Sequence, residues 1–270
     1  MIPNVLHLYW GRNKPLSLLR YMTVTSFAKL NPGWEIIVHY PEEPYHGITW
    51  KSREHRGKSE SHQDYFQLLQ DVDGCETRQI DTPKCAEVMR SDFARWQILA
   101  DGGGWWSDFD ILYVKPMSQL SIPEGVEVVT VRQVGRTGDN LESIGFIGAN
   151  HSKYASDFFN EVLLEAHRNW TPHEYQSAGR FAFAPVLNKA GGKALVLPPH
   201  IVYPIQSWEV HRLYKQSSAP LHEDTIGIHW FGGFSESQKF ERLLEQGKAH
   251  RRPTWLAAQI RNGEVPHVEV

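Results

Sequence analysis

The chain has 270 residues, 41% of them hydrophobic and 22% charged, and its 28 basic and 31 acidic side chains leave a net charge of −3. This composition is typical of a folded globular protein, and it excludes wholesale disorder and a strongly basic surface for binding nucleic acid. Two cysteines, Cys75 and Cys85, are too few for a disulfide-dense scaffold or a four-cysteine zinc site. We expect free thiols, with a single bridge between the two as the alternative. The aromatic content of 12% is high, and aromatic faces are surfaces on which sugars and nucleobases stack.

Residues 1–10 lack the basic and apolar segments of a signal peptide. No stretch approaches the roughly 18 consecutive apolar residues that a membrane-spanning helix needs. We therefore expect a cytoplasmic protein without a transmembrane segment, which leaves peripheral association with a membrane open.

The first part of the sequence alternates strand and helix patterns. Residues 5–10 predict a strand, residues 16–30 a helix that ends at an Asn-Pro-Gly turn, and residues 34–40 a second strand. This order favours a parallel strand–helix–strand unit. Residues 41–63 are polar and rich in charge, and we interpret the stretch 41–85 as a mobile or inserted segment.

Residues 84–100 carry the clearest helical pattern, because their large apolar side chains recur on one face, and glycines 102–104 end the helix. The remaining patterns predict two more helices, six further strands and a polar helical tail. The helices are expected at about 152–168 and 173–190, the strands at 111–114, 127–131, 144–148, 194–197, 201–204 and 226–231, and the tail at 232–270. All of these elements fit a single α/β domain over residues 1–270.

Two Asp-x-Asp triplets occur, and their contexts differ. Asp71-Val72-Asp73 runs into a glycine within a polar stretch, which indicates a solvated turn. Asp108-Phe109-Asp110 leads into an apolar strand, and in extended backbone residues i and i+2 point to the same side. Two carboxylates on one side can hold Mg²⁺ or Mn²⁺ together with substrate phosphates. On spacing alone, a surface turn capped by two acids is an equal alternative.

Asp92 and Arg95 lie three residues apart on one face of the predicted helix 84–100. Such a pair is often a routine ion pair within the helix. It can also be presented at a site, where the rigid fork of Arg95 would bind anionic or hydroxyl oxygens.

Residues 89–110, MRSDFARWQILADGGGWWSDFD, resemble the signature of D-x-D sugar-binding glycosyltransferases. The family meant is that of the clostridial glucosylating toxin catalytic domains and the fungal initiating α-1,6-mannosyltransferases. Its pattern is a helix with Ser-Asp-x-x-Arg, followed by Leu, Gly-Gly, an aromatic residue and Asp-x-Asp. Residues 2–11 and 228–230 resemble the opening and C-terminal segments of that family, whereas its Thr-Gly-Pro occurs here only as residues 178–180, Ala-Gly-Arg.

The resemblance implies a single GT-A type, Rossmann-like nucleotide-sugar-binding domain with a mixed, mostly parallel central sheet flanked by helices. The implied reaction moves a hexose from a UDP- or GDP-sugar to a hydroxyl of a glycan or polysaccharide, with retention of configuration and with Mn²⁺ or Mg²⁺ as cofactor. No general base stands out in the sequence, so the departing phosphate is expected to accept the proton of the attacking hydroxyl.

The resemblance also implies roles for individual residues. Trp10 would stack on the nucleobase, and Asp92 and Arg95 would bind the donor sugar or ribose. Gly103 and Gly104 would form the tight turn beside the diphosphate. Asp108 and Asp110 would hold the metal and act in catalysis with Arg95, and His229 or Trp230 would contact the metal or the diphosphate. The loop before the strand at 144 is expected to place polar groups on the sugar or acceptor side, with Asp139, Asn140 and Glu142 as candidates.

Two other classes of function remain open. A glycoside hydrolase would use two carboxylates as acid and nucleophile, without metal or nucleotide. A non-catalytic carbohydrate-binding protein on the same scaffold would explain the tryptophans but not the two acids of residues 108–110. Sequence signatures of phosphate loops, dinucleotide-binding loops and His-Glu-x-x-His metalloproteases are absent.

Overall fold

A computed structural model describes residues 1–47, 63–215, 221–249 and 254–261 of the chain. Its centre is a seven-stranded sheet in the order β3-β2-β1-β4-β7-β6-β8. The strands are β1 (Val5–Tyr9), β2 (Glu35–Tyr40), β3 (Cys75–Gln79), β4 (Gly104–Ser107), β6 (Val128–Val134), β7 (Asn140–Ala149) and β8 (Ala194–Leu197). Only β7 runs antiparallel to its neighbours, so the predicted mixed, mostly parallel sheet is confirmed.

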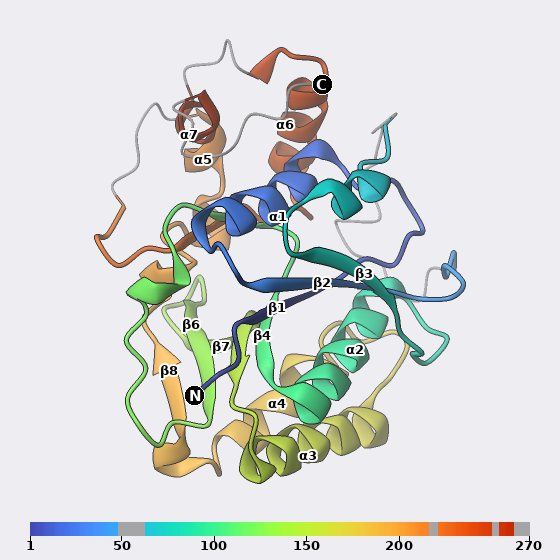
Figure 1. Cartoon of the computed structure of the whole chain (residues 1–270), viewed down its shortest axis with the longest axis vertical. Coiled ribbons are helices and arrows are strands. Elements are labelled where there is room, and N and C mark those ends of the chain that lie inside the picture. The colour runs from blue at the N-terminus through green and yellow to red at the C-terminus, as the bar shows by residue number, and fades with distance from the viewer. Residues whose placement is uncertain (48–62, 216–220, 250–253, 262–270) are drawn as a thin grey trace.

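Helices cover both faces of this sheet. Figure 1 shows α2, α3 and α4 on one side and α1, α5, α6 and α7 on the other. The helices are α1 (Leu18–Leu30), α2 (Glu87–Gly102), α3 (Lys153–Asn169), α4 (Arg180–Leu187), α5 (His211–Lys215), α6 (Ser235–Glu245) and α7 (Trp255–Arg261). A separate hydrophobic core lies on each face, which is why β1 and β4 are apolar along almost their whole length.

A second, two-stranded sheet joins distant parts of the chain. It pairs β5 (Ile111–Tyr113) with β9 (Gly227–His229) in antiparallel orientation, and Ile111 is opposite His229. The C-terminal segment is thereby fixed beside the residues that directly follow β4.

Two predicted elements are wrong. No strand forms at 201–204. Ile201 ends a 3₁₀ helix, Pro199–Ile201, and the next three residues are irregular. The prolines at 199 and 204 lack the backbone N–H groups that pairing in a sheet needs. The expected helix at 173–190 begins only at Arg180, because Gln176 takes a left-handed backbone conformation with φ of 71°.

The stretch 41–85 contains a strand that the sequence did not predict. Its described part holds a 3₁₀ helix, Phe66–Asp71, and the edge strand β3, which pairs with β2. Residues 48–62 lie outside the described residues, so the interpretation of the stretch as a mobile or inserted segment stays a prediction.

The remaining predictions concern an acidic turn, the two cysteines and the C-terminal tail. Asp71, the last residue of the 3₁₀ helix, and Asp73, in the turn that follows it, are both exposed, and the turn ends at Gly74, whose φ is 70°. Cys75 and Cys85 are free thiols. Within the predicted tail, α6 and α7 are helical, and residues 262–270 lie outside the described residues. None of the described helices combines the length and the apolar character that crossing a membrane requires.

Candidate active site

A cleft of about 1040 Å³ opens where β1 and β4 end. Trp10 follows β1 at this edge, Asp108 and Asp110 follow β4, and Gly145 of β7 and the turn before α4 complete the lining. In open α/β sheets, ligands bind at the carboxyl ends of the parallel strands. The cleft is at the upper end of the size range of small-molecule sites, large enough for a donor and part of an acceptor.

The two acids of the Asp-x-Asp triplet face this cleft because Phe109 between them is anchored in the core. The Phe109 side chain is buried and packs edge-to-face on Trp10, with the ring centroids 5.7 Å apart. Thr23 of α1 donates a hydrogen bond to the Phe109 carbonyl at 2.8 Å, and the amide of Asp108 donates to the carbonyl of Gly145 at 2.8 Å. The triplet forms the turn between β4 and β5, not the regular strand end that the pattern predicted.

Asp110 is held by the C-terminal segment. Its Oδ1 atom lies 3.0 Å from Nε2 of His229, and its Oδ2 accepts a 2.8 Å hydrogen bond from the amide of Gly232. The Nδ1 atom of His229 accepts from the amide of Phe231, so the proton of the neutral ring is on Nε2, which donates to Asp110. Burial alone would raise the pKa of Asp110, but His229, the Gly232 amide and the charge of Arg20 together hold it below its ordinary value.

Arg95 connects the other two acids of the site. Its guanidinium donates to Oδ1 of Asp92 at 2.7 Å and to Oδ1 of Asp108 at 3.0 Å. The indole of Trp106 donates to the same Asp108 oxygen at 3.0 Å. Burial of Asp92 raises its pKa to about 7, despite the opposing charge of Arg95. Asp92 and Arg95 are therefore more than a routine pair within a helix, because Arg95 also fixes a cleft carboxylate that follows another element.

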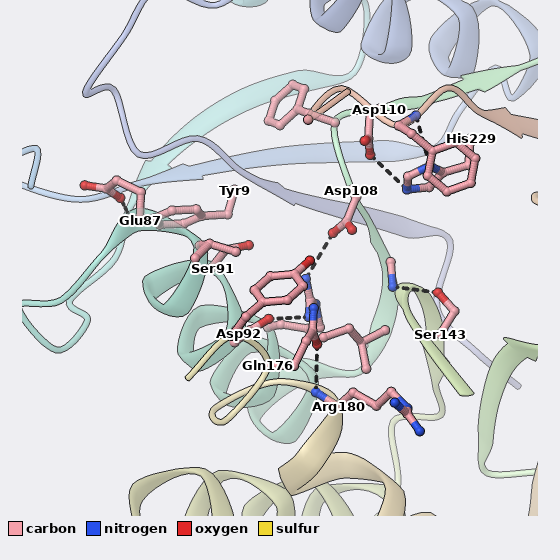
Figure 2. A pocket seen from close by; sticks show the side chains of 18 of the residues that line it. Tyr9, Glu87, Ser91, Asp92, Asp108, Asp110, Ser143, Gln176, Arg180 and His229 are labelled. Carbon is pink, nitrogen blue, oxygen red and sulfur yellow. Dashed lines mark hydrogen bonds and ion pairs between the residues drawn. The ribbon is translucent and has the colours of Figure 1, made fainter. Parts of the chain in front are cut away.

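Asp108, Asp110 and His229 each offer one potential metal ligand, and these atoms lie within 4.8 Å of one another (Figure 2). The Oδ2 atom of Asp108 accepts no hydrogen bond from the described residues and faces the space at Gly145, where a Cβ atom would approach it to 2.8 Å. Carboxylate oxygens are the ligands that Mg²⁺ and Mn²⁺ prefer, so the donor set fits such an ion. Since Nε2 of His229 carries a proton, the carboxylates would ligate and His229 would orient Asp110.

A second group with metal-binding chemistry lies away from the cleft. His200, His222 and Asp224 bring potential ligand atoms within 4.8 Å of one another, and none of the three lines the cleft. Of the two groups of potential metal ligands found among the described residues, the one that contains Asp108 and Asp110 therefore lines the cleft.

Of the two tryptophans predicted to contact the nucleotide or its metal, Trp10 lines the cleft and Trp230 does not. Trp10 lines the cleft, with the guanidinium carbon of Arg20 5.3 Å from its ring centroid. Trp230 is fully buried and does not line the cleft; its ring centroid lies 5.2 Å from the guanidinium carbon of Arg20. Its neighbour Phe231 lines the cleft instead, so the predicted ligand contact of Trp230 is not supported by its position.

The glycines predicted beside the diphosphate also lie elsewhere. Gly103 and Gly104 have φ of 66° and 94° and form the tight turn from α2 into the start of β4, against the carbonyl of Ala149 and the ring of His7. Asp108 follows the opposite end of that strand. These glycines serve the close packing of α2 on the sheet and do not line the cleft.

Of the three candidates predicted in the loop before residue 144, one lines the cleft, and the structure places two of them, Asn140 and Glu142, within β7 and not in a loop. Glu142 lines the cleft, whereas Asp139 and Asn140 are exposed outside it. Asp139 is bonded to Thr137 within the loop and acts as a turn former.

Two features of the cleft were not predicted. Gln176, with its left-handed backbone, lines the cleft, and its side-chain oxygen accepts from the amide of Arg180 at 3.1 Å. Glu87 also lines the cleft; it accepts from the hydroxyl of Tyr9 at 2.8 Å, and burial raises the pKa of Glu87. The resemblance at residues 178–180 was the only sequence signal near Gln176.

Comparison with known proteins assigns the fold. No family model matches the sequence, and no curated protein matches it. Similar solved structures include the PaToxG glycosyltransferase, with 20% identity, 70% of each chain covered and a TM-score of 0.50. The glycosyltransferase GlyE of Streptococcus pneumoniae has 11% identity over 98% of this chain and 64% of its own, with a TM-score of 0.52. The WbbM bifunctional glycosyltransferase has 12% identity over 86% of this chain and 46% of its own, with a TM-score of 0.50.

The fold is that of the GT-A glycosyltransferases. At these identities the likeness shows the fold alone, and the assignment to the toxin and mannosyltransferase family stays a prediction. This chain spans about half of WbbM and about two thirds of GlyE.

Proposed function

We propose that this chain is a metal-dependent glycosyltransferase that moves a hexose from a UDP- or GDP-sugar to a hydroxyl of a glycan. The observation that carries the proposal is the convergence of Asp108, Asp110 and His229 at a cleft beside the ends of β1 and β4. The GT-A fold supports it, because the solved structures of similar fold named above are glycosyltransferases.

Asp108 and Asp110 would hold Mn²⁺ or Mg²⁺, and the bound ion supplies Lewis-acid stabilisation of a diphosphate leaving group. His229 holds the carboxylate of Asp110 in position, and Arg95 does the same for Asp108. Trp10 offers the ring on which a nucleobase stacks, next to the positive charge of Arg20.

The donor sugar would lie between the acids and Gln176. Asp92, Arg95 and Gln176 line this part of the cleft and offer oxygen and nitrogen atoms for sugar hydroxyls. We further propose retention of configuration, with the acceptor hydroxyl giving its proton to the departing phosphate oxygen. In that reaction the bond from the anomeric carbon to the phosphate oxygen breaks as the bond to the acceptor oxygen forms on the same face.

Thermal unfolding tests this function without knowledge of the acceptor. Ligands that bind only the folded state stabilise it by about 2.7 kcal/mol at a hundredfold excess over Kd, a shift of a few degrees in Tm. UDP-glucose, UDP-galactose, UDP-N-acetylglucosamine and GDP-mannose are each added with Mn²⁺ or with EDTA. At least one should raise Tm in the presence of Mn²⁺ only.

Asp110→Asn should abolish that shift, and Asp157→Asn, which changes an exposed acid of α3, should keep it. The proposal fails if no nucleotide sugar stabilises the chain with metal while a free oligosaccharide does. Retention is tested by NMR of the freshly formed product, whose anomeric configuration should match that of the donor.

A further inference from the structure

One of the three arginines that line the cleft has no acid to pair with among the described residues. Arg20 pairs with Glu241, and Arg95 pairs with Asp92 and Asp108. Arg180 also lines the cleft, but no carboxylate among the described residues forms an ion pair with its guanidinium. Its Nε atom is buried and has no hydrogen-bond partner in the part of the chain that the structure describes. A buried donor without an acceptor is unfavourable, and a ligand that accepts hydrogen bonds from this guanidinium would offset that cost.

Arg180 is well separated from the proposed diphosphate end. Figure 2 shows Asp110 and His229 at one end of the cleft and Arg180 at the other, beyond Asp92 and Gln176. A diphosphate bound near Asp108 and Asp110 would therefore lie away from Arg180 and would not pair with it. The free guanidinium calls for a second anion.

Two exposed aromatic rings lie beside this cation. Tyr175 and Phe181 line the cleft and are 48% and 47% exposed, among the most exposed large apolar side chains of the described residues. The guanidinium carbon of Arg180 lies 6.0 Å from the ring centroid of Phe181. Exposed apolar surface at the rim of a cleft marks a binding site, and flat rings with a polar neighbour suit the apolar face of a sugar.

We propose that Arg180, Phe181 and Tyr175 form the acceptor subsite, and that the acceptor is a glycan whose sugar carries an anionic group. The group is a uronic acid carboxylate or a phosphate ester, since the planar fork of an arginine binds both through paired hydrogen bonds. The sugar ring stacks on Phe181 or Tyr175 while its anionic group reaches Arg180. This inference rests on the proposed function and specifies the acceptor that it left open.

Binding of three small probes tests the subsite. Methyl glucuronide, methyl glucoside and glucose 6-phosphate are titrated by saturation-transfer NMR, with Mg²⁺ present to neutralise the acids. The full chain should bind one of the anionic probes about tenfold or more tightly than methyl glucoside, as expected for hydrogen bonds to a charged group. The tighter of the two anionic probes distinguishes a carboxylate from a phosphate.

Arg180→Ala should remove this preference, Arg180→Lys should restore part of it, and Phe181→Ala should weaken all three probes alike. Arg168→Ala and Leu164→Ala, exposed changes on α3, are the matched controls and should leave binding unchanged. Equal binding of charged and neutral probes would overturn the proposal.

Donor binding separates this inference from the proposed function. Arg180→Ala should keep the Mn²⁺-dependent shift in Tm with the nucleotide sugar. Loss of that shift in Arg180→Ala would assign the residue to the donor and overturn the acceptor subsite, whereas absence of any shift in the unmodified chain would overturn the proposed function itself.

Discussion

The Nε2 atom of His229 lies 3.0 Å from Oδ1 of Asp110, and this contact joins the C-terminal strand of the second sheet to the turn that follows β4. The ring donates its proton to the carboxylate, because its other nitrogen accepts from the Phe231 amide. His229 is thus a positioning residue for Asp110.

His229→Ala should lower the affinity for Mn²⁺, measured by titration in the presence of nucleotide, by about 10- to 100-fold, as is typical when a partner of a metal ligand is removed. His229→Gln keeps a side-chain donor and should recover part of the affinity. The exposed His151→Gln is the control. Complete loss of Mn²⁺ binding in both His229 variants would instead make His229 a direct ligand.

Gly145 leaves the room that Asp108 needs. A Cβ at this position would lie 2.8 Å from Oδ2 of Asp108 and 2.8 Å from the hydroxyl of Tyr203, closer than such contacts occur. Gly145→Ala should therefore displace Asp108 and reduce Mn²⁺-dependent nucleotide binding by at least about tenfold, an effect of about 1.4 kcal/mol. Gly192→Ala, where a Cβ meets nothing within 4 Å, should bind as the unmodified chain does. Unchanged Mn²⁺ affinity in Gly145→Ala would show that Oδ2 of Asp108 does not face the ion.

Arg95 should matter to stability as well as to the site. Both Arg95 and Asp92 are buried, and because burial already raises the pKa of Asp92 to about 7, Asp92 takes up a proton when Arg95 is removed. The cost of Arg95→Leu is then mainly the loss of the hydrogen bonds to Asp92 and Asp108, about 1.5–3 kcal/mol. Urea unfolding at neutral pH should show a loss of this size for Arg95→Leu. Lys153→Ala, which breaks an exposed pair with Asp157, should cost less than about 1 kcal/mol. A loss in Arg95→Leu as small as that in Lys153→Ala would contradict the assignment of a buried charge bridge.

A pair of buried histidines predicts how stability depends on pH. Nδ1 of His7 lies 3.1 Å from Nε2 of His39, and burial lowers the pKa of His7 to about 4 and that of His39 to about 3. In the unfolded chain both rings take up protons below about pH 6.5. Their contribution to stability is therefore complete above pH 6.5 and is lost as the pH falls toward 4.

Each ring contributes a slope of about 1.4 kcal/mol per pH unit in that window. Urea unfolding between pH 7 and 5 should show the free energy of unfolding of His39→Gln falling less steeply than that of the unmodified chain, by about this amount. The other titrating groups are common to both proteins and cancel in the difference. Parallel pH profiles would contradict the assignment.

Local patterns carried the prediction of most helices and strands. The helix that became α2 was evident because one apolar face recurs through four turns, and the triplet at 108–110 was evident because Phe109 is an apolar residue between two acids. The edge strand β3, with the sequence CETRQ, gave no signal, since its side chains are mostly exposed and polar. Its position depends on pairing with β2, which the sequence of β3 alone does not encode.

The acids and the arginine at the centre of the site are close in the sequence, and their own pattern indicated them. Asp92, Arg95, Asp108 and Asp110 share one short stretch, and the structure brings their side chains together. The part played by His229 required the resemblance, because its contact with Asp110 depends on the pairing of β5 with β9. Gln176 could not be found, because a left-handed backbone at a glutamine has no signature in sequence.

The number of Mn²⁺ ions bound per chain tests the central claim most directly. Equilibrium dialysis with a nucleotide sugar that stabilises the chain should give one Mn²⁺ per unmodified chain, and none in Asp108→Asn/Asp110→Asn at the same concentrations. The double variant must also keep a cooperative thermal transition, so that the loss reflects the two carboxylates alone. Equal Mn²⁺ binding by the folded double variant and the unmodified chain would contradict the account.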